Sequence, residues 1–167
     1  DRSPSRGLGD VYKRQLLDSH DVSRFLSLCG GDTASYRLAF LFMMCFVGMP
    51  TIFYGDELGV QGIREEEYRA PMPWKGGDMA LSGFFRKAIA MRHALSPLRD
   101  GTFQMLSAEE GSRVIRFRRD TGAASVMVCI NAGNTATAIP QSGETLYWAE
   151  GLQNGILSPG GFSVTYR

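Results

Sequence analysis

The sequence has little excess charge and few residues that bind metals or form disulfides. Its 18 basic and 17 acidic residues leave a formal net charge of +1, which gives no electrostatic basis for binding nucleic acid or an anionic membrane. The two histidines, His20 and His93, are too few for most histidine-based metal sites. Cys29, Cys45 and Cys129 are odd in number and widely spaced, so we expect reduced, buried thiols and no disulfide framework. Free thiols in turn favour a cytoplasmic location.

Long hydrophobic stretches are also missing. The longest apolar run covers residues 38–49, which is shorter than the roughly 18–20 residues that span a bilayer. It is therefore predicted to be a buried helix. Residues 1–15 have no initiating Met, no periodicity and no apolar signal segment. We expect this stretch to be a non-native leader, similar to translated adapter sequence, and the native protein to extend upstream of Leu16.

The remaining composition is ordinary for a globular protein. The chain has 167 residues, of which 44% are hydrophobic and 21% charged. This length suffices for one medium domain or two small ones. A change from helical to strand-like patterning near residue 101 predicts two, at residues 16–100 and 101–167.

The first of these parts alternates between short strands and helices. Residues 16–17 are expected to end a buried strand, and residues 51–54 are β-branched and aromatic, which predicts another. Between them a helix is predicted over residues 34–47, with Asp32 or Thr33 as its N-cap. This order predicts a βαβ unit with parallel strands and a right-handed crossover.

Polar residues follow both predicted strands, at residues 18–24 and 56–57. In α/β proteins the carboxyl ends of parallel strands meet at one edge of the sheet, and side chains there build pockets. By spacing alone, a strand-end turn with a helix cap is the simpler explanation of the first cluster. Two readings of residues 18–24 therefore stay open at this point.

A long loop and a second helix complete this part. Residues 60–78 are too long for a simple connection, and such loops are functional or disordered. Tyr68 and Trp74 argue against disorder. Helical spacing of apolar residues predicts a helix over residues 81–95, and residues 98–101 are expected to be a linker.

The second part consists of short runs with strand-like alternation, separated by turn residues such as 158–161. The predicted strands are residues 102–106, 113–118, 125–130, 145–148 and 162–166. Short alternating strands with frequent turns predict a small antiparallel β-sandwich.

Three motifs and this β-region carry a family resemblance. Residues 17–24 read Leu-Asp-Ser-His-Asp-Val-Ser-Arg, residues 48–59 fit Gly-x-Pro-x-Ile-x-Tyr-Gly-x-Glu-x-Gly, and residues 69–74 fit Arg-x-Pro-Met-x-Trp. In this order they resemble the segments that follow barrel strands seven and eight in the α-amylase family of glycoside hydrolases. Residues 102–167 resemble the family's C-terminal domain. The Ser-His-Asp variant and the Arg-x-Pro-Met-x-Trp loop favour the branch of neopullulanase, cyclomaltodextrinase and maltogenic amylase.

The resemblance implies a fold, a reaction and site residues. The fold would be the last quarter of a (β/α)₈ barrel, with strands seven and eight, followed by an all-β antiparallel sandwich. The reaction would be retaining hydrolysis of α-glucosidic bonds in maltooligosaccharides, cyclodextrins or pullulan. Asp21 matches the carboxylate that stabilises the transition state, and His20 matches a histidine that binds the same sugar. Arg69 and Trp74 are candidate substrate-binding residues, with simple packing of the loop as the alternative for both.

The resemblance also implies what these residues lack. The family's nucleophilic Asp and acid/base Glu follow strands four and five, and no acid in residues 16–167 matches their motifs. We therefore expect this chain alone to be inactive. An amylase-like scaffold or partner subunit without catalysis is the alternative function, and the upstream sequence would distinguish the two.

Three further polar residues are expected to be structural. Asp18 is expected to be a strand-end acid, Arg24 to pair with an acid near the strand end, and Glu57 to form structural hydrogen bonds. The acidic run at residues 65–67 is expected to be a solvated loop face.

No cofactor is expected for this chain. Calcium binds some relatives, but no Asp- and Asn-rich oxygen cluster supports a site here. The partner that the resemblance implies is an α-glucan oligosaccharide. Nucleic acid and membrane are not expected partners, and a homodimeric parent protein is compatible with the sequence.

Overall fold

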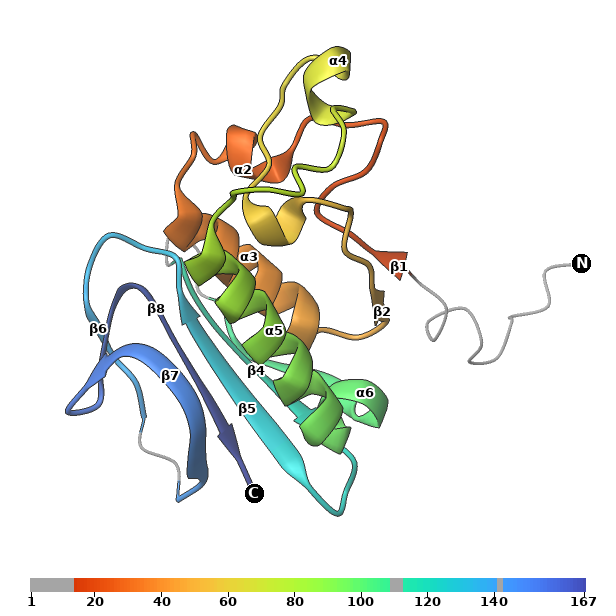
Figure 1. Cartoon of the computed structure of the whole chain (residues 1–167). Coiled ribbons are helices and arrows are strands. Elements are labelled where there is room, and N and C mark those ends of the chain that lie inside the picture. The colour runs from red at the N-terminus through yellow and green to blue at the C-terminus, as the bar shows by residue number, and fades with distance from the viewer. Residues whose placement is uncertain (1–13, 109–112, 141–142) are drawn as a thin grey trace, which may run out of the picture. The chain divides into compact units, whose positions relative to one another are not determined.

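The computed structural model describes residues 14–108, 113–140 and 143–167 of the chain. Contacts divide the chain into two compact units, residues 1–89 and 90–167, and each is described by itself. Unit 1 holds short strands and helices, whereas unit 2 is mostly β-sheet (Figure 1). Across the described ranges, no helix combines the length and hydrophobicity needed to cross a membrane.

Unit 1 contains a pair of short parallel strands. β1 (Arg14–Gln15) pairs with β2 (Met49–Pro50), and the Thr51 N–H donates to the Gln15 carbonyl oxygen at 2.7 Å. The predicted parallel pairing around a helical segment is confirmed. The predicted position of the first strand is wrong: the strand lies at residues 14–15, inside the predicted leader, and not at residues 16–17. Backbone pairing places this strand, and the side chains of residues 14–15 carry no pattern that indicates it. Residues 1–13 of the predicted leader lie outside the described ranges.

The strand predicted at residues 51–54 is also wrong. The N–H of Phe53 donates to the Asp56 carboxylate at 3.0 Å, and the carbonyl oxygen of Tyr54 accepts from Arg24 Nη1 at 2.9 Å. Side chains thus satisfy backbone groups that a longer strand would have paired with its neighbour. The ladder therefore stops after Pro50.

Helix α3 (Thr33–Cys45) forms the centre of unit 1. Asp32 is the N-cap, as predicted, because its carboxylate accepts from two amides of the first turn. The Ser35 hydroxyl and these amides lower the pKa of Asp32. Helix α5 (Met79–Ala94) lies beside α3 (Figure 1), and the rings of Phe40 and Phe85 stack with their centroids 3.5 Å apart. Aromatic packing therefore joins the two helices.

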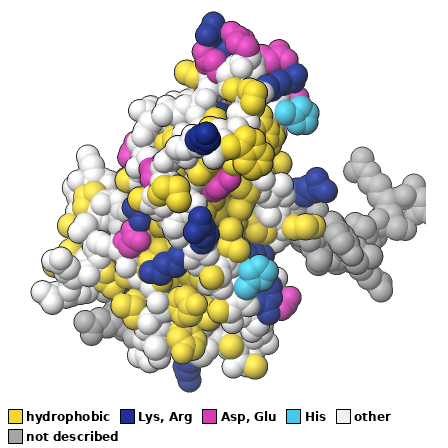
Figure 2. All heavy atoms as spheres, viewed as in Figure 1, with side chains coloured by type: hydrophobic (Ala, Val, Ile, Leu, Met, Phe, Trp, Pro, Cys, Tyr) yellow, Lys and Arg dark blue, Asp and Glu magenta, His cyan; other side chains and the backbone are white. Residues whose placement is uncertain are grey.

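Short helices occupy the loops of unit 1. They are α2 (Phe25–Leu28), the 3₁₀-helix η1 (Asp56–Leu58) and α4 (Glu65–Tyr68), which lies within the predicted loop 60–78. The Glu67 carboxylate accepts from the amides of the two residues before α4 and thereby starts this helix. The same hydrogen bonds lower the pKa of Glu67 to about 2. The predicted solvated acidic run is thus one exposed helical turn, and charged side chains gather at this end of the unit (Figure 2).

Helix α6 (Ser96–Asp100) replaces the linker predicted in unit 2. Pro97 lies in its first turn, where a fixed φ angle suits the helix and the missing N–H is not needed. The buried Arg119 donates from Nη1 to the Leu98 carbonyl at 3.0 Å and from Nη2 to the Gly101 carbonyl at 2.8 Å. These bonds satisfy carbonyl groups at the end of the helix, which local sequence did not indicate.

The described strands of unit 2 form one antiparallel sheet, as predicted for an all-β part, where two packed sheets of a sandwich were expected. The strands are β3 (Thr102–Ser107), β4 (Val114–Asp120), β5 (Ser125–Asn131), β6 (Thr137–Ala138), β7 (Thr145–Gln153) and β8 (Ile156–Tyr166). The order among the described strands is β3-β4-β5-β8-β6, and β7 pairs with β8. Phe117, Val128 and Val164 are fully buried, in line with the predicted alternation.

An irregular segment interrupts the pairing of β8. Glu150 pairs with Phe162 and Leu152 with Leu157, so residues 158–161 bulge out of the ladder. A Cβ atom on Gly161 would lie 2.8 Å from the Ser158 carbonyl oxygen. The turn predicted at these residues is therefore a bulge within a longer strand.

The three cysteines are thiols outside any disulfide, as predicted. Cys45 and Cys129 are buried, and Cys29 is half-buried. Burial raises the pKa of Cys129 to about 11, so this thiol stays protonated and unreactive near neutral pH.

Candidate functional site

The His20–Asp21 turn is an exposed polar surface between β1 and α2. Both side chains are about two-thirds exposed, and His20 Nε2 lies 3.2 Å from Asp21 Oδ2. The Asp21 N–H donates to the Ser19 hydroxyl at 3.2 Å, which supports the turn locally. Imidazole and carboxylate thus stand side by side and reach solvent. This arrangement can hydrogen-bond the hydroxyl groups of a polar ligand.

Arg69, which directly follows α4, makes polar contacts with the His20–Asp21 turn. Its Nε donates to the His20 carbonyl oxygen at 2.7 Å, and its Nη2 lies 3.4 Å from Asp21 Oδ1. Its Nη1 lies 2.7 Å from Glu65 Oε1, one helical turn back. The sequence shows no sign of this contact, because Arg69 and Asp21 are 48 positions apart in the chain. Sequence reasoning also missed Glu65, since acids in a charged run give no sign of which one has a tertiary partner.

Trp74 is a highly exposed side chain. Its exposed fraction is 86%. Among the described residues, no hydrogen bond or ring contact joins Trp74 to His20, Asp21 or Arg69. Because Trp74 is so exposed, its burial does not support the alternative that it only packs the loop. Stacking of a sugar ring on Trp74 stays a prediction.

A buried polar cluster lies next to the turn in sequence. Arg24 is fully buried, and its Nη1 lies 3.0 Å from Asp56 Oδ1. Its guanidinium also lies over the Phe53 ring, 4.3 Å from the centroid. The predicted pairing of Arg24 with an acid near a strand end is therefore confirmed.

Asp18 belongs to the same cluster. It is buried, and its Oδ1 accepts from the Phe25 N–H at the start of α2. Burial and the neighbouring Asp18 carboxyl raise the pKa of Asp56 to about 8. The structural role expected for Asp18 is confirmed by this helix-start bond. Glu57 is half-buried on η1, and its hydrogen-bonding role stays a prediction.

Backbone contacts hold the loop of residues 60–78 against the turn. The Arg24 N–H donates to the Gly62 carbonyl at 2.8 Å, and the Gly62 N–H donates to the Ser27 hydroxyl at 2.8 Å. A Cβ on Gly62 would lie 2.5 Å from the Tyr68 backbone nitrogen, so only glycine fits there without a shift. The Tyr54 hydroxyl donates to the Ala70 carbonyl further along the loop at 2.8 Å. These bonds bring Arg69 within reach of Asp21.

Potential metal ligands do not gather in this region. No group of three or more His, Cys, Asp or Glu side chains that could hold a metal ion occurs within the described ranges.

Comparisons with known proteins match both the motifs and the fold. The family model described as "Alpha amylase, catalytic domain" matches residues 5–96, more than half of the chain. Neopullulanase 2 of Thermoactinomyces vulgaris is 39% identical over 134 residues, which are 77% of this chain and 23% of that protein. A cyclomaltodextrinase of Bacillus sp is 36% identical over 142 residues, which are 84% of this chain and 24% of that protein.

Solved structures extend the likeness to unit 2. A debranching enzyme of Nostoc punctiforme matches 93% of this chain and 34% of its own length, with a TM-score of 0.81 and 26% identity. A cyclomaltodextrinase structure matches 93% of this chain and 30% of its own length, with a TM-score of 0.77 and 30% identity.

These matches decide the fold class and the family. The chain spans about a quarter of the length of the curated relatives it matches. The predicted fold class, part of an amylase (β/α) barrel followed by an antiparallel β region, is confirmed. The chain belongs to the α-amylase family of glycoside hydrolases and is similar in sequence to its neopullulanases and cyclomaltodextrinases.

Proposed function

We propose that this chain is the C-terminal part of a retaining glycoside hydrolase that acts on α-glucans. Maltooligosaccharides, cyclodextrins and pullulan are the proposed substrates, in line with the names of the neopullulanase and cyclomaltodextrinase relatives. The observation that carries the proposal is the exposed His20–Asp21 pair held by Arg69.

Asp21 has the central role in the proposed chemistry. Retaining hydrolysis passes through an oxocarbenium-like transition state, in which hydrogen bonds to ring hydroxyls strengthen. A carboxylate that holds these hydroxyls accelerates the reaction only if its bonds tighten as the ring flattens. Asp21 is the carboxylate proposed for this task, and His20 donates to the same sugar. Trp74 offers an exposed aromatic face on which a sugar ring can stack.

Arg69 is proposed as a positioning residue, which refines the substrate-binding role expected from sequence. Its guanidinium contacts the His20 carbonyl, Asp21 and Glu65, so its donors are largely engaged within the chain. Such a clamp limits the rotamers of the Asp21 carboxylate before substrate arrives.

The nucleophile and the acid/base catalyst are assigned to a part of the longer protein upstream of residue 16. We therefore expect the purified 167-residue chain to show no hydrolysis of maltotriose or β-cyclodextrin. Dose-dependent hydrolysis by this chain would contradict that assignment.

A fusion enzyme tests the role of Asp21. The upstream region of the Bacillus sp cyclomaltodextrinase is joined to residues 14–167, so that β1 is kept, and kcat and KM are measured on β-cyclodextrin. We expect an active fusion, in which Asp21→Asn lowers kcat about 100- to 1,000-fold with a much smaller change in KM, as for the loss of other transition-state contacts. Glu66→Gln, an exposed acid paired with Arg64, is the matched control and should leave kcat unchanged.

Two outcomes would count against the proposal. An unchanged kcat in the Asp21→Asn fusion would remove Asp21 from catalysis. A folded fusion that binds β-cyclodextrin but does not hydrolyse it, while the intact relative does, would favour the scaffold function.

A further inference from the structure

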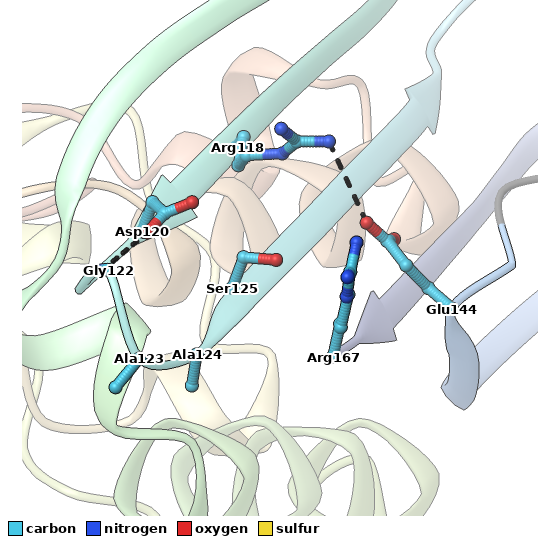
Figure 3. Close-up of a pocket in the computed structure, with 8 residues that line it drawn as sticks. All are labelled: Arg118, Asp120, Gly122, Ala123, Ala124, Ser125, Glu144 and Arg167. Atoms are coloured by element: carbon cyan, nitrogen blue, oxygen red, sulfur yellow. Dashed lines mark hydrogen bonds and ion pairs between the residues drawn. The ribbon is translucent and has the colours of Figure 1, made fainter.

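Unit 2 contains a polar pocket that the proposed function does not use (Figure 3). It has a volume of about 330 Å³ and lies between the β4–β5 turn, the start of β7 and the end of β8. Its polar side chains are Arg118, Asp120, Ser125, Glu144 and Arg167, and small residues of the turn at 122–124 line the rest.

The backbone of this pocket is firmly held. Ser125 and Arg167 exchange two main-chain hydrogen bonds, each 2.9 Å long. Asp120 accepts from the Gly122 N–H through Oδ1 at 2.5 Å, which closes the turn. The polar side chains therefore project from fixed positions, and a ligand would not have to order the loop on binding.

Glu144 and Arg118 form the inner wall. The Glu144 side chain is 7% exposed, and its Oε2 accepts from the Thr165 hydroxyl. Arg118 Nη2 lies 3.8 Å from Glu144 Oε1, beyond hydrogen-bond distance. The Arg118 side chain is 35% exposed, so the outer donors of its guanidinium can reach a ligand oxygen in the pocket.

Hydrogen-bond donors and acceptors lie next to one another in the pocket. Figure 3 shows the guanidinium groups of Arg118 and Arg167 directed toward the Glu144 carboxylate, with the Ser125 hydroxyl facing the space between them. Two guanidinium groups and the carboxylates of Asp120 and Glu144 balance in charge, so the pocket does not select a multiply charged anion.

The chemistry of the wall points to one class of ligand. A hydroxyl group donates one hydrogen bond and accepts another, which suits a wall where guanidinium donors stand beside carboxylate acceptors. No aromatic ring is among the described residues that line the pocket, so a flat apolar ligand would find no stacking surface there. We propose that this pocket binds a small, neutral, polyhydroxylated ligand, namely a single sugar ring or a polyol. This inference rests on unit 2 alone and does not depend on the proposed function.

Titration of the ¹⁵N-labelled 167-residue chain tests the pocket. D-glucose and myo-inositol are added up to about 100 mM, because ligands with few atoms commonly bind in the millimolar range. We expect saturable amide shifts at Gly122, Ala124 and Ser125 with at least one of the two probes. Arg167→Ala should weaken binding about tenfold, the effect of one lost charge-assisted hydrogen bond.

The controls separate this inference from trivial effects. Arg113→Ala, an exposed arginine outside the pocket, should leave the affinity unchanged. Arg118→Gln should also weaken binding, and the spectrum itself reports whether each variant is folded. The absence of saturable shifts with both D-glucose and myo-inositol would overturn the proposal. Saturation by inorganic phosphate or acetate at the same amides would also overturn it, since that would make the site an anion site. Equal affinities in the Arg167→Ala and Arg113→Ala variants would remove the pocket as the binding site.

Discussion

Replacing Asp18 with Asn tests the buried polar cluster of unit 1. The side chains of Asp18, Arg24 and Asp56 are all buried. Two ionised carboxylates beside one guanidinium would leave an unbalanced negative charge in a site closed to water. One proton shared by Asp18 and Asp56 would remove this charge. It would also supply a partner to Asp18 Oδ2, which has none within the described residues when both acids are ionised.

The shared proton makes stability depend on pH. Burial and the Asp18 carboxyl raise the pKa of Asp56 from 3.8 to about 8. Folded chains therefore keep a proton that unfolded chains release above about pH 4. The stability from this proton is fully present below the unfolded pKa, declines as the pH rises, and is lost once the pH passes the folded pKa.

The size of this pH dependence follows from the difference between the folded and unfolded pKa values of Asp56. Each pKa unit corresponds to about 1.4 kcal/mol, so the full window bounds the loss at about 6 kcal/mol. The attraction between Arg24 and the ionised form of Asp56 is already contained in this raised pKa. Between about pH 5 and pH 8 we therefore expect the free energy of unfolding to fall by about 3–4 kcal/mol.

Asn at position 18 should abolish most of this dependence. Its amide oxygen can still accept from the Phe25 N–H, and its NH₂ group can donate to Asp56 in place of the shared proton. Urea unfolding, followed by circular dichroism of the helices, measures the free energy at both pH values. The pH dependence of Asp18→Asn should be less than half that of the parent chain.

Asp100→Asn, at an exposed aspartate, is the matched control and should keep the parent's pH dependence. Glu67 also titrates abnormally, but its pKa lies at about 2, below this window. A parent chain that is equally stable at both pH values would refute the shared proton. An Asp18→Asn chain whose free energy of unfolding changes with pH as much as that of the parent chain would refute it as well.

The remaining predictions concern packing, capping and backbone fit. Gly62→Ala should lower the free energy of unfolding by about 1–3 kcal/mol in urea titrations, because its Cβ would lie 2.5 Å from the Tyr68 nitrogen. Asp32→Ala should lower it by about 1 kcal/mol through loss of the α3 N-cap, whereas Asp32→Asn should retain most of it. Phe40→Ala should cost about 3–5 kcal/mol, since it removes the ring stacked on Phe85. A cost below about 1 kcal/mol for Phe40→Ala would mean that this stack contributes little to unit 1.

Local chemistry explains which elements the sequence predicts well. The N-cap Asp32, the body of α3 and the core of α5 follow from signals within a few residues of each other. The alternation in β4 and β5 likewise follows from neighbouring residues. These predictions hold because the interactions involved are short-range along the chain.

Long-range hydrogen bonds explain the failures. The strand predicted at residues 51–54 stops early because Arg24 and Asp56 bond to its backbone. Helix α6 is completed by Arg119, which lies about twenty residues further along the chain. The local sequence does not indicate such distant partners. Propensity alone therefore predicted a strand at residues 51–54 and a linker at residues 98–101.

The candidate site likewise has features that the sequence predicts and features that only distant contacts determine. The order of its motifs was enough to identify the family, and it made His20 and Asp21 candidate site residues, because they stand at fixed spacing within one of these motifs. Tertiary structure alone decided that Arg69 and Glu65 brace this pair, that Asp18 and Asp56 form one buried cluster with Arg24, and that Trp74 faces solvent. The physical reason is that a contact depends on which distant backbone bonds, such as those of Gly62, bring two loops together, and a linear pattern does not contain that distance.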